Sequence, residues 1–332
     1  MSKQYPDTIP GSYKLAVVLL NYRTPDLIVQ CLESLVPQID PDQARVVVVD
    51  NHSEDGSAAK IQAAVRDNDW SERVTVLESG HNGGFSFGNN YGVRRIDAEL
   101  YLLLNSDTFL REGALAELVG AADQHPQAAM LSPRLEWPDE TPQESTFTFH
   151  RPAWELIHSA GTGLVSKAFR RYTVARPVCD RPSDFEWTSF ACVMIRKSLF
   201  DEIGLLDEGY FMYFEDVDFC RRAHAAGAEV LHWPQARVVH LRGGSSDVKS
   251  SIAERKRPPR YFYASRARYY KKFYGRSGLF FTNLLWHLGR TVSWARELVR
   301  NKRPHLCQRE SRDIWIAFGQ PVGEKVVGEA RR

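Results

Sequence analysis

Three carboxylates stand within four residues at Glu215-Asp216-Val217-Asp218, directly after the aromatic run Tyr210–Phe214. Burial beside large apolar side chains and mutual repulsion raise the pKa of a carboxyl group, as a general base working near neutral pH requires. Glu215 and Asp216 are therefore candidate catalytic residues. The structural alternative is that these acids only begin a helix, where the helix dipole favours negative charge.

Asn105-Ser106-Asp107 directly follows the apolar segment Leu100–Leu104. A carboxylate at the carboxyl end of a strand is well placed to hold a divalent cation that bridges phosphate oxygens, since Mg²⁺ prefers hard oxygen ligands. The same three residue types also form ordinary turns. His240, at the end of the sequence ARVVH, is a further candidate ligand, although a single histidine on a short strand is more often structural.

Two other segments have the composition of a nucleotide site. Asp50-Asn51 ends the apolar run VVVV and offers a carboxylate and an amide to a base or a ribose, although the residues that follow also suit a turn. The segment His81–Asn90 contains three glycines and three asparagines, which suit a close approach of the backbone to a ligand. It lacks the G-x-G-x-x-G spacing of dinucleotide sites, which disfavours nicotinamide chemistry. Neither a Walker A sequence nor a G-x-S-x-G nucleophile motif occurs.

The first hundred residues alternate strand and helix patterns, which position these candidates. Short apolar runs predict buried strands at Leu15–Leu20, Val46–Val49, Val74–Leu77 and Leu100–Leu104. Between these runs the apolar residues have helical spacing, which predicts helices, including one over about residues 57–67. This alternation predicts a parallel sheet with helices on both faces. Ligands of such sheets bind beyond the carboxyl ends of the strands, where Asn21, Asp50-Asn51 and Asn105–Asp107 stand.

The second part of the chain is less regular. Residues 133–181 are rich in proline, aromatic and charged side chains, and we expect long loops there. One strand is predicted at Trp187–Arg196, and a helix from about Glu215 to Ala226. Two short strands are predicted to follow at Val230–Trp233 and Val238–Leu241.

Charge divides the 332-residue chain after Ser250. Residues 1–250 carry 24 basic and 35 acidic side chains, whereas residues 251–332 carry 19 basic and 6 acidic ones. Such an asymmetry indicates a tail that meets an anionic surface. Residues 254–276 interleave Arg and Lys with aromatic side chains, and beyond them an apolar stripe at helical spacing runs through Phe281, Leu284, Leu285, Leu288, Val292, Ala295 and Val299.

A basic amphipathic helix with aromatic flanks is typical of an in-plane membrane anchor, and we expect peripheral membrane contact through residues 251–300. Two alternatives compete with this interpretation. Basic and aromatic residues also bind single-stranded nucleic acid, but no nucleic-acid motif accompanies them, so no such partner is expected. The helix can equally pack on the catalytic domain or on a second copy of the chain, which leaves homo-oligomer formation open.

The five cysteines are scattered and form no C-x-x-C pair, which fits a reducing compartment. No apolar run approaches the roughly 20 residues of a spanning helix, and residues 1–10 carry no apolar signal region. We therefore expect a cytoplasmic protein at the inner face of the cell membrane.

Taken together, the sequence resembles a family 2 glycosyltransferase of the GT-A fold, within the bacterial rhamnosyltransferase-like branch. The similarity covers roughly residues 14–275. It rests on five ordered motifs, followed by His240 and Gly243-Gly244-Ser245: VVLLNYRTPDLIVQCLESL at 17–35, VVVVDNHSEDGS at 46–57, HNGGFSFGNNYGV at 81–93, LLLNSD at 102–107, and GLLDEGYFMYFEDVDFCRRAHAAG at 204–227.

This resemblance implies an inverting transfer of a sugar from a nucleotide-diphosphate donor to a hydroxyl acceptor. Asp216 matches the base of the family's Glu-Asp pair. Asp107 matches the metal carboxylate of its Asp-x-Asp motif, and His240 matches a histidine that binds the same Mg²⁺ or Mn²⁺ or the diphosphate. The positions around the donor are matched by Asn21, Asp50, Asn51, Asn82, Phe85, Asn89 and Asn105.

The chain departs from the family's pattern at one position that is common in this branch, and from the branch itself at another. Asn105 replaces the first acid of the metal motif, which leaves Asp107 as its one carboxylate. Phe190 stands where the branch has a small glycine, so the sugar or acceptor pocket is expected to be narrower.

We expect a GT-A catalytic domain over residues 1–250 and a basic, aromatic, mostly helical extension over 251–332. The expected donor is dTDP-rhamnose, and the acceptor a glycan or polyprenyl-diphosphate-linked glycan in the assembly of a cell-surface polysaccharide. Two alternatives remain: a transferase that uses a UDP-sugar, and a non-catalytic scaffold of the same fold that binds nucleotide or glycan.

Overall fold

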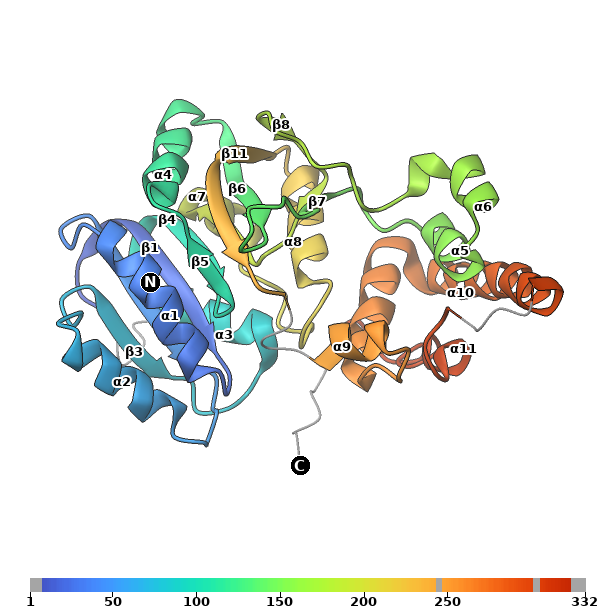
Figure 1. Cartoon of the computed structure of the whole chain (residues 1–332), viewed down its shortest axis with the longest axis horizontal. Coiled ribbons are helices and arrows are strands. Elements are labelled where there is room, and N and C mark those ends of the chain that lie inside the picture. The colour runs from blue at the N-terminus through green and yellow to red at the C-terminus, as the bar shows by residue number, and fades with distance from the viewer. Residues whose placement is uncertain (1–7, 243–246, 301–304, 324–332) are drawn as a thin grey trace.

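The computed structural model describes residues 8–242, 247–300 and 305–323. Within these residues, nine strands form one mixed sheet in the order β3-β2-β1-β4-β10-β6-β11-β5, with β8 paired to β11. Their bounds are β1 Ser12–Asn21, β2 Ala44–Asp50, β3 Val74–Glu78, β4 Asp97–Asn105, β5 Thr108–Leu110, β6 Ala128–Glu136, β8 Ser183–Asp184, β10 Cys192–Arg196 and β11 Glu229–His240. Figure 1 shows the sheet on one side of the molecule and a group of helices on the other.

The parallel half of the sheet confirms the prediction from the apolar runs. β1 pairs in parallel with both β2 and β4, and β2 pairs in parallel with β3. The central residues of β1, β2 and β4 are buried on both faces, which is why these strands read as continuous apolar runs rather than alternating ones. In this register Asn21 lies beside Asp50, so the polar ends of neighbouring strands meet at one edge.

The other half of the sheet differs from the prediction in three ways. The single strand expected at Trp187–Arg196 is two, because the chain leaves β9 (Trp187–Thr188), which pairs with β7 (Thr146–Phe147), before it enters β10. β10 runs antiparallel to β4 and β6. The two short strands expected after Val230 are one strand, β11, with a register shift between Trp233 and Arg237, where Pro234 has no N–H to donate.

Residues 133–181 contain more regular structure than expected. They include the end of β6, β7, and the helices α5 (Pro152–Ala160) and α6 (Gly163–Ala168). Short elements of this kind carry little periodic signal because two to nine residues hold too few turns for a pattern.

Helices cover both faces of the sheet. α1 (Pro25–Leu35), α2 (Ser57–Asp67) and α4 (Ala114–Gln124) pack on one face. The other face is covered by α3 (Gly84–Val93), α7 (Lys197–Ile203), α8 (Glu215–Ala225) and the first part of α10 (Arg260–Arg300). α2 has the bounds that the sequence predicted, and α8 ends one residue earlier.

The C-terminal part is helical, as predicted, with α9 (Asp247–Ala253), α10 (Arg260–Arg300) and α11 (Glu310–Asp313). Gly275, at φ 72° and ψ 176°, interrupts α10 and divides it into two straight parts. α10 packs along α5, where Arg266 pairs with Glu155 at 3.0 Å and both side chains are buried. In the described parts of the chain, no helix is both long and apolar enough to cross a membrane.

The aromatic residues of segment 254–276 lie differently from what a surface anchor needs. Tyr263, Tyr269 and Tyr270 are 0–2% exposed and pack against the rest of the protein. The segment is therefore largely a packing surface. The division of the chain at residue 250 stays a prediction.

Candidate active site

One cavity of about 600 Å³ opens at the carboxyl edge of the sheet. β1, β2, β4 and β11 all end at this edge, because β11 is parallel to β6 and β6 runs in the direction of β4. Most of the predicted site residues line this one cavity, namely Asn51, Asn82, Phe85, Asn105, Asp107, Glu215, Asp216 and His240. Its volume is within the range of small-molecule sites.

Asp107 and His240 face each other in the cavity although 133 positions separate them. The Oδ1 atom of Asp107 is 3.5 Å from Nε2 of His240, and both side chains are buried. The backbone fixes this approach, because β5 pairs Thr108 with His240 and the N–H of Leu241 donates to the carbonyl of Asp107.

The same pair fits a divalent cation. A carboxylate oxygen and an imidazole nitrogen meet beside open cavity, and Nδ1 of His240 has no hydrogen-bond partner among the residues that the structure describes. No group of three His, Cys, Asp or Glu side chains with metal-site geometry occurs in those residues. Two protein ligands suit an ion such as Mg²⁺, which commonly takes its other ligands from water and substrate phosphates.

Glu215 and Asp216 occupy the first turn of α8 and line the cavity. The two residues before them, Tyr213 and Phe214, hold φ values of 71° and 70°, a left-handed conformation that costs free energy for a residue with a Cβ. This strained turn delivers both carboxylates to the cavity. Burial raises the pKa of Asp216 to about 7, while burial and the neighbouring Asp216 raise the pKa of Glu215 well above its usual range.

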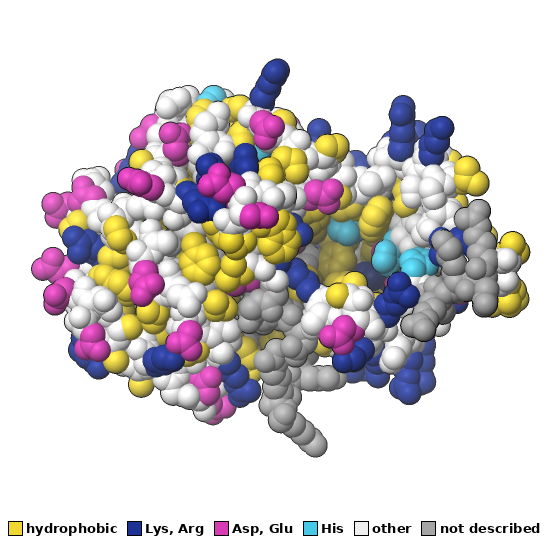
Figure 2. All heavy atoms as spheres, viewed as in Figure 1, with side chains coloured by type: hydrophobic (Ala, Val, Ile, Leu, Met, Phe, Trp, Pro, Cys, Tyr) yellow, Lys and Arg dark blue, Asp and Glu magenta, His cyan; other side chains and the backbone are white. Residues whose placement is uncertain are grey.

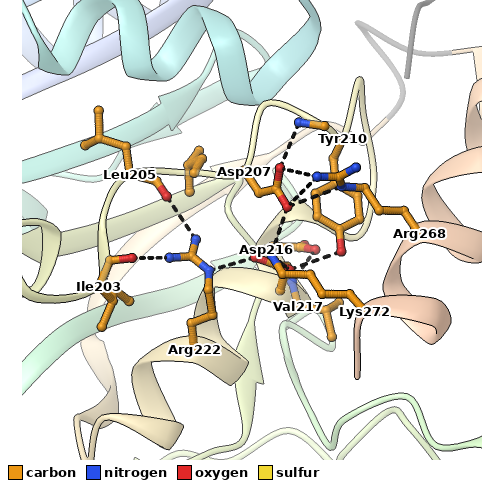
Figure 3. A network of polar contacts seen from close by, with 12 residues as sticks. Ile203, Leu205, Asp207, Tyr210, Asp216, Val217, Arg222, Arg268 and Lys272 are labelled. Carbon is orange, nitrogen blue, oxygen red and sulfur yellow. Dashed lines mark hydrogen bonds and ion pairs between the residues drawn. The ribbon is translucent and has the colours of Figure 1, made fainter. Parts of the chain in front are cut away.

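The third acid of the motif, Asp218, does not belong to the cavity. Its Oδ2 accepts from Nε of Arg222 at 2.8 Å, and its Oδ1 accepts from the hydroxyl of Tyr210 at 3.1 Å and lies 2.6 Å from Nζ of Lys272. Figure 3 shows how Lys272 and Arg268 reach from α10 into this network. The cluster of three acids therefore has two functions: Asp218 anchors α8, and the other two face the ligand space.

Asp207 completes the network on the loop before α8. It accepts from Arg268 at 2.8 Å and from Lys272 at 2.8 Å, and Lys272 thereby bridges Asp207 and Asp218. Although burial alone raises its pKa, the bonds from Lys272 and the charge of Arg268 hold the pKa of Asp207 below its usual range. A Cβ at Gly209 would lie 2.0 Å from the Arg268 guanidinium carbon, so the Arg268 side chain would have to move away from its present position.

The glycine-rich segment holds the opposite wall. Nδ2 of Asn51 donates to Oδ1 of Asn82 at 3.0 Å and to the carbonyl of Gly84 at 3.1 Å, which ties the loop to the end of β2. Gly84 has φ 87°, and a Cβ there would lie 2.0 Å from the carbonyl oxygen of Phe211. The glycine thus permits a close approach between two loops of the protein, in addition to lining the cavity.

Three predicted donor residues lie behind the cavity wall and not among its lining residues. Nδ2 of Asn21 donates to Oδ2 of Asp50 at 2.6 Å, and the Ser53 hydroxyl donates to the same oxygen at 2.6 Å. Nδ2 of Asn89 donates to the carbonyl of Phe85 at 2.9 Å within α3. These contacts hold the loops that carry the lining residues.

Several lining residues were not found from the sequence. Arg242 and Lys249 bring positive charge to the cavity, and Pro259 and Tyr261 extend its wall into the C-terminal part. The sequence signal for Tyr261 was the basic and aromatic composition of residues 254–276, which we interpreted as a surface, whereas Arg242 and Lys249 lie before that segment and were not singled out. The predicted Gly243-Gly244-Ser245 segment lies outside the described residues.

Phe190, the departure noted in the sequence, also lines the cavity and is 3% exposed. Its ring packs against Phe219 of α8 with 5.9 Å between ring centroids. Trp187 lies nearby and stacks on Phe147 at 4.1 Å. Aromatic rings therefore form part of the cavity lining, together with the asparagines.

Comparison with known proteins shows what this chain is similar to. The family described as "Glycosyl transferase family 2" matches residues 16–217. The low-salt glycan biosynthesis hexosyltransferase Agl10 of Haloferax volcanii is 29% identical over 230 residues, 68% of this chain and 66% of that protein. An N-acetylglucosaminyl-diphospho-decaprenol L-rhamnosyltransferase of Mycobacterium tuberculosis is 29% identical over 239 residues, 67% of this chain and 75% of that protein. The chain thus spans just under two thirds of the first relative.

Two solved structures share the architecture. The mannosyltransferase PcManGT from Pyrobaculum calidifontis, in complex with GDP-Man and Mn²⁺, has a TM-score of 0.54 over 91% of this chain and 81% of its own, at 14% identity. GalNAc-T7 with UDP, GalNAc and Mn²⁺ has a TM-score of 0.57 over 94% of this chain and 59% of its own, at 14% identity. These likenesses confirm the predicted GT-A fold.

Proposed function

The chain belongs to glycosyl transferase family 2, and we propose that it transfers a hexosyl group from a nucleoside-diphosphate sugar to a hydroxyl acceptor in the assembly of a cell-surface glycan. One observation carries the proposal: a carboxylate with a raised pKa, Asp216, shares a cavity with the Asp107–His240 pair. A base for the acceptor and a site for the leaving diphosphate are the two groups that this reaction needs.

Asp216 is the proposed base. A carboxylate with a pKa of about 7 accepts the acceptor's hydroxyl proton efficiently at neutral pH. As the proton leaves, the acceptor oxygen attacks the anomeric carbon from the face opposite the departing diphosphate, so the configuration inverts. Glu215, whose pKa is raised further, is proposed to stay protonated beside it and to hold the acceptor by a hydrogen bond.

Asp107 and His240 are proposed to hold the divalent cation, Mg²⁺ or Mn²⁺. The bound ion supplies charge neutralisation for the leaving diphosphate. Arg242 and Lys249 line the same cavity and add positive charge on the protein side. The two similar solved structures, which contain Mn²⁺ together with a nucleotide or a nucleotide sugar, support this assignment.

The donor's nucleotide is proposed to lie between the asparagine wall and Phe85. Asn51, Asn82 and Asn105 offer amides to the base, ribose and phosphates, while Asn21, Asp50 and Asn89 keep these loops in place. We propose dTDP-rhamnose as the donor, and the M. tuberculosis relative, named an L-rhamnosyltransferase, supports the sugar. Phe190 is proposed to limit the sugar or acceptor that fits.

The acceptor is proposed to be a glycan on a polyprenyl diphosphate. The M. tuberculosis relative is named for a decaprenol-linked acceptor, which supports this class. Such an acceptor is held in a bilayer by its lipid, so the enzyme is proposed to work at the cytoplasmic face of the cell membrane.

A donor panel tests the function directly. Each of dTDP-rhamnose, UDP-sugars and GDP-mannose is incubated with the protein, Mn²⁺ and a short lipid-linked acceptor, and glycosyl transfer is followed by mass spectrometry. Transfer from dTDP-rhamnose with inversion, read by NMR of the product, is expected. Transfer from a UDP-sugar alone contradicts the donor, and binding without transfer from any donor contradicts the enzymatic function in favour of a scaffold.

A further inference from the structure

The second part of α10, residues 276–299, has its polar side turned inward. Thr282, Asn283 and Ser293 are 0% exposed, and Glu297 is 9% exposed. Most of the exposed positions are apolar: Phe280, Phe281, Leu284, Leu288, Val292, Trp294, Leu298 and Val299 are 38–85% exposed. Arg276, Ser277 and Thr291 are exposed beside them. Leu279 and Trp286 are buried on the inward side as well. The remaining large apolar side chains lie outward, unlike those of the usual surface helix, which buries its apolar stripe and presents its polar face to water.

The inward polar groups are occupied by protein contacts. Nη1 of Arg266 donates to Oδ1 of Asn283 at 2.9 Å, and Nδ2 of Asn283 donates to the carbonyl of Ile314 at 3.1 Å. Arg290 pairs with Glu297 at 2.8 Å. The inward polar side chains of the helix therefore have partners within the protein, whereas its exposed apolar side chains do not pack in the core.

Gly289 sets the orientation of the helix. A Cβ at this position would lie 2.1 Å from Oγ of Ser159 and 2.5 Å from the carbonyl oxygen of Leu156, both in α5. Only glycine allows the two helices to approach so closely, so this face must point inward. Leu284, Leu288 and Val292 lie on the part of the helix surface that this contact leaves exposed.

The outward face is one continuous strip. Its members Phe281, Leu284, Leu288, Val292 and Val299 follow the three-and-four spacing of a helix, over a length of roughly 27 Å. Single exposed apolar residues are ordinary on protein surfaces, but a contiguous apolar patch marks an interaction site. The strip is too short and too one-sided to span a bilayer and suits a helix that lies in its plane.

Basic side chains accompany the strip. α6 and the turn after it expose Leu164 at 83% together with Lys167, Arg170 and Arg171. This segment adjoins α10, because Arg296 donates to the carbonyl of Gly161, two residues before α6 begins at Gly163. Across residues 163–172 and 276–299 the sequence holds six basic residues and one acidic residue, Glu297. Figure 2 shows dark-blue basic side chains over the α6 region and apolar ones at the end of the helical part.

We propose that residues 276–299, together with α6, bind an anionic lipid membrane, with α10 in the headgroup plane and its apolar strip facing the acyl chains. The charge favours this occupant over a second copy of the chain, since two copies would bring their basic groups together around the strip, whereas anionic lipid attracts each of them. That the bound lipid layer also holds the acceptor rests on the proposed function; the membrane contact does not.

Vesicle flotation of the full chain tests the proposal. Vesicles of phosphatidylcholine with 30% phosphatidylglycerol are compared with phosphatidylcholine alone, at low salt and at 0.5 M NaCl. The triple variant Leu284→Gln/Leu288→Gln/Val292→Gln is expected to lose at least about fivefold of the bound fraction. The matched control Val178→Gln/Ile252→Gln changes two exposed apolar residues outside the strip and is expected to float like the parent.

Two further readouts keep the outcome decisive. Circular dichroism and the thermal shift with donor nucleotide confirm that the triple variant is folded, which is expected because all three changed side chains are exposed. Light scattering reports the oligomeric state. A parent that floats no better than the triple variant overturns the proposal, and a parent dimer that the triple variant converts to monomer, with unchanged flotation, assigns the strip to a second copy instead.

Failure of the proposed function is separable from this test. Flotation needs no turnover, so a protein that floats through its strip but transfers no sugar leaves the membrane contact intact and removes the function. With both correct, the triple variant keeps its rate on a water-soluble acceptor and loses at least about fivefold of its rate on an acceptor embedded in vesicles.

Discussion

Nζ of Lys272, in α10, lies 2.6 Å from Oδ1 of Asp218, in α8, two residues beyond the proposed base. The same ammonium group lies 2.8 Å from Asp207, on the loop that leads into α8 (Figure 3). The C-terminal part thereby holds both ends of the strained turn that presents Asp216. Part of the positive charge of the C-terminal part is therefore paired with acids of the catalytic domain.

Replacement of Lys272 by methionine is expected to lower the free energy of unfolding by about 2–3 kcal/mol, because Asp207 and the buried Asp218 each lose a partly buried ionic partner. It is also expected to lower kcat, since α8 carries the base. Chemical denaturation and steady-state rates measure the two effects. The control Lys256→Met removes an exposed pair with Glu254 and is expected to change stability by less than about 1 kcal/mol. Equal effects of both variants contradict the bridging function of Lys272.

Asp216→Asn is expected to abolish sugar transfer and leave donor binding within about threefold, since removal of a general base costs about 10²–10⁴ in rate. It is also expected to raise the melting temperature at pH 8. At that pH the native carboxylate is ionised in a cavity that disfavours its charge, and the amide removes this cost. Asp201→Asn, at an exposed position of α7, serves as the matched control and should change neither. An active Asp216→Asn enzyme would require another base.

The pH dependence follows from the same group. Its pKa of about 7 means that Asp216 is mostly protonated below pH 7, and a protonated base accepts no proton. We expect kcat to fall about tenfold for each pH unit below that value and to level off above it. Stability should change in the opposite sense: between the unfolded pKa near 3.8 and about 7 the native state holds a proton that the unfolded chain has lost, so this group's contribution to stability declines as pH rises. A rate that is flat from pH 5.5 to 8 contradicts this assignment.

Gly84→Ala is expected to cost at least about 2 kcal/mol of stability and to weaken donor binding. The new Cβ would meet the Phe211 carbonyl in a left-handed backbone conformation, so the two loops must separate. The matched control is Gly120→Ala in α4, where a Cβ has open space and a helical backbone, and stability should rise by up to about 1 kcal/mol. Thermal unfolding with and without nucleotide compares the pair. Unchanged donor binding in Gly84→Ala would separate this loop from the donor site.

Asp107→Asn and His240→Ala are each expected to weaken Mn²⁺ binding by about 10–100-fold in the presence of nucleoside diphosphate, because a charged interaction contributes about 1.5–3 kcal/mol. Electron paramagnetic resonance of free Mn²⁺ measures this without turnover. Chelation of the parent enzyme should stop transfer, and added Mn²⁺ should restore it. His232→Ala, which changes a buried histidine outside the cavity, serves as the control. If both site variants keep the full Mn²⁺ affinity of the parent, the ion does not bind at Asp107 and His240.

The sequence predicted those parts of the site that local patterns determine. Continuous apolar runs located the four parallel strands, and the polar residues at their ends, such as Asn51 and Asp107, therefore fell at one edge of the sheet. The first turn of α8 was likewise visible from its three acids. In each case the signal lies within about ten residues, where the periodicity of a strand or helix is read directly.

Contacts between distant segments escaped the prediction. Nothing in the composition of residues 254–276 distinguishes Lys272, which pairs with an acid 54 positions earlier, from a lysine that faces lipid. Tyr261 lines the cavity and Tyr270 bonds to Glu155 for the same reason: tertiary packing selected them. The interruption between β9 and β10 was also missed, because the residues on both sides of it favour strands.

The kink at Gly275 sets the angle between the part of α10 that reaches the cavity and the part that carries the exposed apolar strip. The first part of α10 begins at the cavity wall beside Tyr261, and its second part carries the exposed apolar strip. If that strip rests on lipid, the height of the cavity above the bilayer is fixed by the angle at Gly275. The enzyme would then accept only glycans whose reactive hydroxyl lies at that height above the bilayer. Acceptor length would therefore be a determinant of specificity that does not depend on the residues lining the cavity.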